Sequence, residues 1–408
     1  MSEGFENKND WEMPRNIKII LCVLGVFLSV VIICLIVFRD AVYAVYRNLT
    51  APVYMLNNND EWGGGESYIR VPYALESDAE YLDLYVPYSE EKPPLFVLVH
   101  GGGFITNDSQ SRQAKLMYRY FRDCGFACAS VNYRLAQEAG FPAALLDVKA
   151  AVRFLRAHED EYGYDASHIA IWGESAGGYL ATMVAITNDD EFMELSYIGQ
   201  ESRVVDGFDM GTAGNNGSAD GFDMSEGVDD GASDAGAFVS AKVDVLIDYY
   251  GHTEMIEQHD DWKTLKYPRI VIDIGNSWEN SVDYGGYEDL HSYFLRQHIK
   301  DLSDDEIEKL NPYYYIDENF GDGDDPAVWI THGDCDITVP YLMSERLYDA
   351  LSEKLPEDKL AFDLVPDMGH ASDPLYSDEE LARICDFIVS EICNFAYYKA
   401  SGGCARIL

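Results

Sequence analysis

The chain has 408 residues, and 47% of them are hydrophobic, so it can bury a full core. Its 29 basic and 72 acidic residues give a formal net charge of −43, which repels a phosphate backbone and disfavours nucleic acid as a partner. The 8 cysteines include no CxxC pair and none has a histidine at zinc-like spacing, so we expect neither a disulfide framework nor a structural metal, and the thiols in apolar patterns are predicted to be buried and free.

An uncharged apolar run of 20 residues, from Ile19 to Phe38, follows a polar segment at 1–18. Its length matches a bilayer span and exceeds the apolar core of a cleavable signal peptide, so we expect a single membrane anchor rather than a cleaved signal or a core helix. Three basic residues precede the run and two follow it by residue 47. This small excess favours the N-terminus inside and the rest of the chain in an extracytoplasmic position.

Residues 39–66 are polar, end in three glycines at 63–65, and are expected to form a flexible tether. Beyond them, apolar runs typical of strands alternate with helical patterns, which predicts right-handed crossovers and one domain over 67–408 with a mainly parallel, eight-stranded sheet flanked by helices. The expected strands are 68–74, 80–87, 95–100, 126–133, 168–172, 243–249, 327–332 and 360–365. The expected helices are 111–123, 143–158, 176–187 and 378 to about 397.

Two segments interrupt this alternation. Residues 188–240 are rich in Gly, Asp and Ser, and their low apolar content cannot offset the entropy of ordering, so a disordered surface insertion is expected. Its Asp spacing leaves calcium binding as a minor alternative, although the EF-hand pattern is missing. Residues 251–325 are rich in Tyr and Asp and are expected to cap the pocket, with their histidines in the core or in solvent.

The motif Gly-Glu-Ser-Ala-Gly at 173–177 lies between an expected strand and an expected helix. A serine on so sharp a turn is exposed and strained, and flanking glycines prevent side-chain clashes there. The N-terminal amides of the following helix also favour negative charge. Ser175 is therefore the candidate nucleophile, while Glu174 is expected to form structural hydrogen bonds rather than to act as a second base.

A second glycine motif, His-Gly-Gly-Gly-Phe at 100–104, follows the expected strand 95–100. Residues without side chains allow backbone amides to approach a substrate oxygen closely. The amides of Gly102 and Gly103, with that of Ala176, are the candidate oxyanion donors. His100 is expected to shape this loop by hydrogen bonding rather than to transfer protons.

An acid and a histidine should follow the nucleophile in that order, each after a strand. His370 lies after the last expected strand and before the last helix, and it is the candidate general base. Asp334 and Asp336 both follow the expected strand 327–332, and position alone leaves either as the orienting acid. His332 is expected to pack at the end of that strand.

Taken in order, these motifs resemble the HGGG-type α/β-hydrolase serine esterases, which include hormone-sensitive-lipase-like enzymes and bacterial carbohydrate acetyl or feruloyl esterases. The resemblance runs from about residue 68 to the C-terminal helix. It is carried by the motifs at 100–104, 131–135, 173–178, 332–340 and 369–370. It implies an α/β-hydrolase fold, a Ser175–His370–Asp336 triad with Asp336 rather than Asp334 as the acid, and a reaction without a cofactor.

The activity implied by this resemblance is hydrolysis of short-chain or carbohydrate-linked carboxylic esters through a covalent acyl-enzyme. A serine peptidase, a formamidase or a lactonase would use the same residues on the same fold. A non-enzymatic, membrane-anchored interaction module with a hydrolase fold is the alternative outside catalysis. It has no evident use for a serine on a strained turn.

The anchor leads to a first prediction. Full-length protein should fractionate with membranes, and a chain that begins at Tyr54 should be soluble and active, because every candidate catalytic residue lies beyond Val99. Fractionation with an esterase assay of both pools measures this, and protease protection reports the side of the membrane. Full-length protein that remains soluble without detergent would contradict the anchor.

Overall fold

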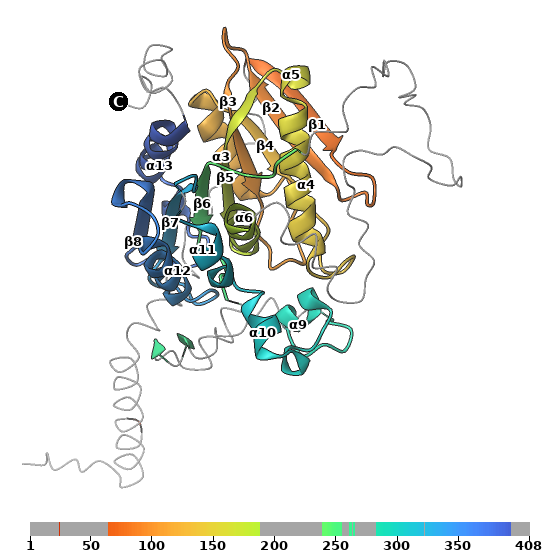
Figure 1. Cartoon of the computed structure of the whole chain (residues 1–408), viewed down its shortest axis with the longest axis vertical. Helices are drawn as coiled ribbons and strands as arrows, with labels where there is room; N and C mark the ends of the chain where they lie inside the picture. The colour runs from red at the N-terminus through yellow and green to blue at the C-terminus, as the bar shows by residue number, and fades with distance from the viewer. Residues whose placement is uncertain are drawn as a thin grey trace, which may run out of the picture.

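The computed structural model describes residues 64–187, 239–254, 283–321 and 323–392, together with residues 24, 261, 262, 264 and 265. Their strands form one eight-stranded sheet in the order β1-β2-β4-β3-β5-β6-β7-β8 (Figure 1). β1 and β2 pair antiparallel, as do β2 and β4, and the strands from β4 through β3 to β8 are parallel, as predicted. The strands are β1 (Gly65–Pro72), β2 (Tyr81–Pro87), β3 (Pro94–Val99), β4 (Ala127–Val131), β5 (Asp165–Glu174), β6 (Val245–Tyr249), β7 (Ala327–Gly333) and β8 (Leu360–Val365).

Central strands such as β3 are apolar at every position because both faces of the sheet are covered. Leu95, Val97 and Val99 pack into one hydrophobic core, and the alternate residues Phe96 and Leu98 pack into a second core on the opposite face. All five side chains are buried. A continuous apolar run is the pattern expected of a parallel strand buried on both sides.

The long helices divide between these two faces. α4, α6 and α12 contribute buried residues to the first core, and α3 and α13 contribute to the second. This gives the three-layer arrangement seen in Figure 1. Their bounds are α3 (Arg112–Asp123), α4 (Ala143–Ala157), α6 (Ala176–Ile186), α12 (Leu342–Ser352) and α13 (Asp378–Ile392), and the shorter helices are α5 (Glu159–Tyr162), η3 (Glu357–Lys359) and η4 (Asp373–Tyr376).

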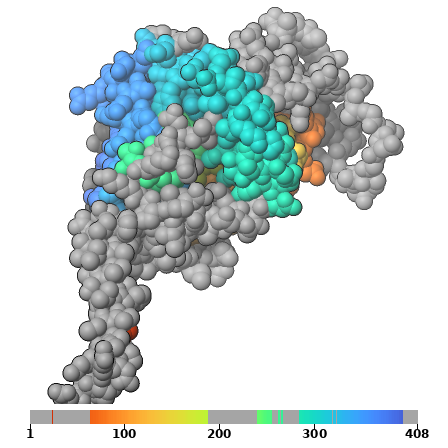
Figure 2. All heavy atoms as spheres, turned by 90° about the horizontal axis from the view of Figure 1, so that it is seen from below, coloured from red at the N-terminus to blue at the C-terminus, as the bar shows by residue number. Residues whose placement is uncertain are grey.

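The described part of the expected cap is helical and packs on the loop that follows β3. The Phe294 ring stacks on Phe104 with centroids 3.9 Å apart, and the Phe294 carbonyl accepts a hydrogen bond from the Phe141 amide. The Tyr179 hydroxyl on α6 donates to the Leu310 carbonyl. Seen from below, this segment forms a broad part of the surface, coloured teal (Figure 2). Its elements are α9 (Leu290–Leu295), η2 (Ile299–Asp301), α10 (Asp304–Glu308) and α11 (Tyr313–Asn319).

Several expectations fall on other parts of the chain. The expected anchor 19–38 lies outside the described residues except for Leu24, and the insertion 188–240 is described only at 239–240. Among the described residues, no helix is long and apolar enough to cross a bilayer. β1 begins at Gly65 and so takes in the last two residues of the expected tether 39–66. Cys124, Cys128 and Cys385 are buried and form no disulfide, as predicted.

The central strand β6 carries a buried acidic side chain. Asp248, on β6, is fully buried, and a Cβ atom built on Gly178 or on Gly251 would lie 2.6 or 2.1 Å from its Oδ1. Glycine at these two positions therefore makes room for the carboxyl group. Burial raises the pKa of Asp248 to about 7, although the nearby Gly251 amide partly opposes the rise.

This carboxyl group should make stability depend on pH. Its folded pKa lies above its ordinary value near 4, so its contribution is fully present below about pH 4 and is lost as the pH rises through 7. Asp248→Asn, which stays neutral, should raise the free energy of unfolding at pH 8 by about 1–3 kcal/mol and have a smaller effect at pH 5. Urea denaturation at the two pH values measures this. A variant that is less stable at pH 8 would show that the ionised carboxylate stabilises the fold.

Candidate active site

The turn between β5 and α6 is a single residue. Glu174 ends the strand, Ala176 begins the helix, and Ser175 between them has φ 53° and ψ −119°. This left-handed backbone is strained for a residue with a side chain, and it persists only where neighbouring contacts enforce it. The Ser175 amide donates to the Tyr249 carbonyl at 2.9 Å, which ties the turn to the end of β6.

The glycines of the motif are required by close backbone contacts. A Cβ atom on Gly173 would lie 2.1 Å from the Gly177 carbonyl oxygen, and a Cβ atom on Gly177 would lie 2.3 Å from the Val99 carbonyl oxygen. Neither distance is possible between non-bonded atoms. The spacing of the motif therefore reflects how tightly α6 turns back onto the sheet.

The fold brings Ser175, His370 and Asp336 together from three loops. The His370 Nε2 atom lies 3.1 Å from the Ser175 Oγ, and its Nδ1 atom lies 2.7 Å from the Asp336 Oδ2. Since an ionised carboxylate only accepts hydrogen bonds, Nδ1 carries the proton and Nε2 is free to accept from the serine hydroxyl. This is the arrangement required of a nucleophile, a base and an orienting acid.

The Asp336 carboxylate is fully buried yet well supplied with partners. Its Oδ1 accepts from the amides of Thr338 and Val339 at 2.8 and 2.9 Å. Burial by itself would raise the pKa of Asp336, but the charges and hydrogen bonds of His370 and His332 outweigh this effect and hold the pKa below its ordinary value. Asp336 therefore stays ionised across the neutral range.

His332 corrects the sequence analysis. Instead of only packing at the end of β7, it places Nε2 3.2 Å from the Asp336 Oδ2, while its Nδ1 lies 2.8 Å from the Ser344 Oγ. Both His332 and Asp336 are fully buried. His332 thus contacts the Asp336 carboxylate and helps to hold it in place. The signal for it was the short spacing of four residues between the histidine and the aspartate in the motif 332–340.

Asp334, the other candidate for the orienting acid, has a different role. The Asp334 Oδ1 accepts from the Asp367 amide at 2.6 Å, so this residue joins the loop after β7 to the loop after β8. Asp336, not Asp334, contacts His370. The geometry therefore supports the choice between the two that the family resemblance implied.

The glycine loop after β3 lies directly against the nucleophile. A Cβ atom on Gly101 would lie 3.2 Å from the Ser175 Cβ. Gly102 and Gly103 have φ values of 119° and 58°, in a region that favours glycine. The Ala176 amide, at the first position of α6, has no intrahelical acceptor. These are the three amides expected from the sequence to bind an oxyanion.

His100 shapes this loop. Its ring is buried and stacks on Tyr133 with centroids 4.3 Å apart, and its Nδ1 lies 2.8 Å from the Gly101 carbonyl oxygen. Burial lowers the pKa of His100 to about 4, so the imidazole is neutral at physiological pH. Both observations agree with a structural role.

Two histidines of the expected cap lie beside the site. The His252 amide donates to the Ser175 carbonyl, and the His252 ring lies 4.5 Å from the ring of His291 on α9. His252 is buried, and burial lowers the pKa of His291 to about 4. The cap therefore pairs two imidazoles, one of them on a residue whose backbone binds the nucleophile's carbonyl. Within the described residues, no group of three or more His, Cys, Asp or Glu side chains could hold a metal ion.

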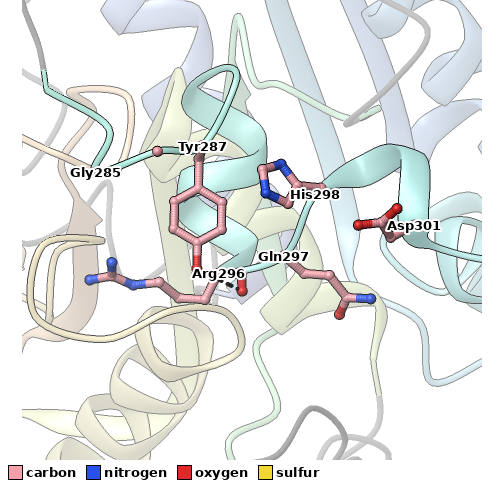
Figure 3. A pocket seen from close by; sticks show the side chains of 7 residues that line it. Gly285, Tyr287, Arg296, Gln297, His298 and Asp301 are labelled. Atoms are coloured by element: carbon pink, nitrogen blue, oxygen red, sulfur yellow. Dashed lines mark hydrogen bonds between the residues drawn. The ribbon is translucent and has the colours of Figure 1, made fainter.

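A cavity of about 460 Å³ lies on the surface of the cap rather than at the triad. Its lining combines two glycines and four polar side chains with the Tyr287 ring, and the Tyr287 hydroxyl donates to the Arg296 carbonyl at 3.0 Å (Figure 3). The lining residues are Gly285, Gly286, Tyr287, Arg296, Gln297, His298 and Asp301.

Comparisons with known proteins agree with this geometry. The BD-FAE family model matches residues 82–351. The probable carboxylic ester hydrolase LipM of Mycobacterium tuberculosis is 32% identical over 138 residues, which are 33% of this chain and 32% of LipM. The chain thus spans about a third of the length of this curated relative.

Solved structures extend the similarity to most of the chain. A carbohydrate esterase from gut microbiota has a TM-score of 0.58 at 22% identity and covers 84% of this chain and 99% of its own. A bifunctional GH43-CE protein of Bacteroides eggerthii has a TM-score of 0.55 at 25% identity, covering 80% of this chain and 38% of its own. The predicted resemblance to α/β-hydrolase esterases and the α/β-hydrolase fold are therefore confirmed.

The two aspartates after β7 provide a matched test of the site. Asp336→Asn should lower kcat for a p-nitrophenyl ester by about 10³-fold or more, because only the residue in contact with His370 fixes its tautomer. Asp334→Asn should lower kcat less than tenfold. Steady-state kinetics of both variants, with circular dichroism to check folding, measure the difference. A larger loss in Asp334→Asn would exchange the two roles.

Proposed function

Since this chain belongs to the BD-FAE family, we propose that it hydrolyses carboxylic esters, short-chain or carbohydrate-linked, through an acyl-enzyme formed on Ser175. The observation that carries the proposal is the hydrogen-bonded series from Ser175 through His370 to a buried, ionised Asp336. Such a series activates a hydroxyl group that is otherwise a weak nucleophile.

Acylation follows from these contacts. The His370 Nε2 takes the proton of Ser175 as its Oγ attacks the ester carbonyl, and the developing oxyanion binds the amides of Gly102, Gly103 and Ala176. The C–O bond to the alcohol then breaks, and His370 gives its proton to the departing alcohol. Amides already held in place by the fold need no reorganisation during the reaction.

Deacylation repeats the sequence with water. His370 takes a proton from the water molecule that attacks the acyl carbonyl, and it returns this proton to the Ser175 Oγ as the acid leaves. Asp336 remains ionised throughout and stabilises the imidazolium. The reaction is complete with these side chains and amides and requires no cofactor.

The carbohydrate-linked part of the proposal draws support from the cap. In the cavity of Figure 3, the phenol ring of Tyr287 lies with the amide of Gln297 and the carboxylate of Asp301. Planar polar groups beside an aromatic ring can bind the hydroxyl groups of a sugar while its apolar face packs on the ring. One structural neighbour is also described as a carbohydrate esterase.

A serine peptidase, a formamidase, a lactonase and a non-enzymatic module remain the alternatives to this proposal. The strained Ser175 backbone favours catalysis over the module, because strain of this kind is retained where it serves a reaction. We further propose that residues 19–38 anchor the protein in a membrane with the catalytic domain on the extracytoplasmic side.

An ester panel tests the activity. The protein should hydrolyse p-nitrophenyl acetate and butyrate faster than the palmitate and should release acid from acetylated or feruloylated sugars. Ser175→Ala should lower kcat by about 10⁴-fold while the melting temperature changes little, since the glycines rather than the hydroxyl shape the turn. Wild-type protein that cleaves peptide or formamide substrates but no ester would overturn the proposal, as would an active Ser175→Ala variant.

A further inference from the structure

Next to the triad lies a second buried carboxyl group that the mechanism above does not use. Glu174 precedes the nucleophile and is 3% exposed. Its Oε2 accepts hydrogen bonds from the hydroxyls of Tyr250 at 2.9 Å and Tyr376 at 2.7 Å, and its Oε1 accepts from the Gly101 amide at 3.4 Å. These contacts agree with the hydrogen-bonding role expected from the sequence. They also join three separate loops to one side chain.

Each of the three loops carries part of the site. Gly101 begins the loop of the expected oxyanion amides, Tyr250 follows β6, and Tyr376 ends η4, which lies on the segment after His370. The two phenol oxygens also contact each other. Glu174 therefore lies where the oxyanion loop and the histidine segment meet.

Tyr250 links Glu174 to the general base, His370. Its ring lies 4.7 Å from the His370 ring at an interplanar angle of 63°, an edge-to-face contact. The Tyr250 backbone has φ 43°, and its amide donates to the Thr331 carbonyl at 2.7 Å. The ring is thus held by β7 at its backbone and by Glu174 at its hydroxyl, and it forms a fixed wall for the imidazole.

Tyr249 adds further contacts between the loops that carry Ser175 and His370. Its carbonyl accepts from the Ser175 amide at 2.9 Å, and its hydroxyl donates to the Leu375 carbonyl at 3.0 Å. The end of β6 therefore contacts both the nucleophile and the segment that carries the base. A strained left-handed residue at Tyr250, beside another at Ser175, is the kind of backbone that persists at functional sites.

The electrostatics are compatible with an acceptor at Glu174. Burial raises the pKa of this carboxyl, whereas the two phenols, the Gly101 amide and the nearby His370 oppose the rise. Burial also raises the pKa of Tyr250 and of Tyr376 well above the ordinary value, so both phenols remain protonated donors. Three donors aimed at one carboxyl group limit the cost of burying it.

We propose that Glu174, Tyr250 and Tyr376 form a positioning unit for the hydrolytic reaction, in which the Glu174 carboxyl group holds both the oxyanion loop and the aromatic wall of His370. The proposal rests on the esterase function proposed above. None of the three residues takes a proton from the substrate. They act through Gly101 and His370, by keeping the amides and the imidazole aligned with the Ser175 Oγ.

Two conservative variants test the unit. Glu174→Gln replaces one acceptor with a donor, and Tyr250→Phe removes the hydroxyl while keeping the ring. Each should lower kcat for p-nitrophenyl acetate by about tenfold per active site, with KM within twofold, because alignment affects the transition state more than substrate binding. In the double variant, kcat should fall by much less than the product of the two single-variant factors. The reason is that the two side chains share one hydrogen bond.

Tyr164→Phe is the matched control. The Tyr164 hydroxyl is buried and donates to the Leu155 carbonyl at 2.6 Å, away from the triad. Its loss should lower the melting temperature about as much as Tyr250→Phe does and leave kcat unchanged. Thermal denaturation and titration of active sites with a fluorophosphonate separate a folding defect from a catalytic one.

The rate of fluorophosphonate labelling provides a second readout, because it requires an activated Ser175 but no ester turnover. Glu174→Gln and Tyr250→Phe should slow labelling about tenfold, whether or not an ester substrate has been found. Labelling and kcat within twofold of wild type in both variants would overturn the positioning unit. So would fully multiplicative effects, or an equal loss of kcat in Tyr164→Phe. Normal labelling of wild-type protein that hydrolyses no ester would overturn the proposed function instead.

Discussion

The site depends on one strained residue. Ser175 adopts a left-handed backbone between a strand and a helix that meet with no other residue between them. This conformation costs of order 1–3 kcal/mol and must be stabilised by its surroundings. The Tyr249 carbonyl, the glycines at 173 and 177 and the loop after β3 supply those contacts. Because the same contacts place β6, the oxyanion loop and α6, the turn that exposes the hydroxyl also arranges the groups around it.

Buried carboxyl groups near this turn show how their surroundings set their charge. Asp336 has two amides and two imidazoles as partners, and its pKa falls below the ordinary value. Asp248 has the opposite shift, since burial dominates where only one amide opposes it. Burial is therefore a poor guide to ionisation by itself. The number and charge of the partners decide whether a carboxyl group can stabilise an imidazolium.

The cap contributes to the surroundings of the site rather than to its catalytic groups. Its described helices contact the oxyanion loop through Phe294 and Phe104, and His291 on α9 meets His252 next to the nucleophile. The catalytic groups come from the sheet and its loops, whereas the cap lines and covers their surroundings. This division agrees with a fold in which one sheet supports many substrate preferences through variable loops.

Much of the framework could be predicted from the sequence. Apolar runs and helical periodicity depend on neighbours in the chain, so they located all eight strands and four of the five long helices to within a few residues, whereas α12 was not predicted. The glycine motifs predicted the turn at Ser175 and the loop at 100–104, because a close backbone approach restricts the residue type locally. Strand order and the family resemblance then selected His370 and Asp336.

Only the tertiary structure decided which side chains surround the catalytic residues. Tyr376 lies 202 residues from Glu174, and Tyr250 lies 76 residues from it, yet both hydroxyls meet at one carboxylate oxygen. The sequence predicts His332 only as a packing residue, because its place at the end of a strand does not fix the direction of its ring, which turns toward Asp336. The periodicity of apolar residues predicts which face of a helix or strand is buried. The partner of a buried polar group is decided by which loops the order of the sheet brings to one edge, and that order joins residues that the sequence keeps far apart.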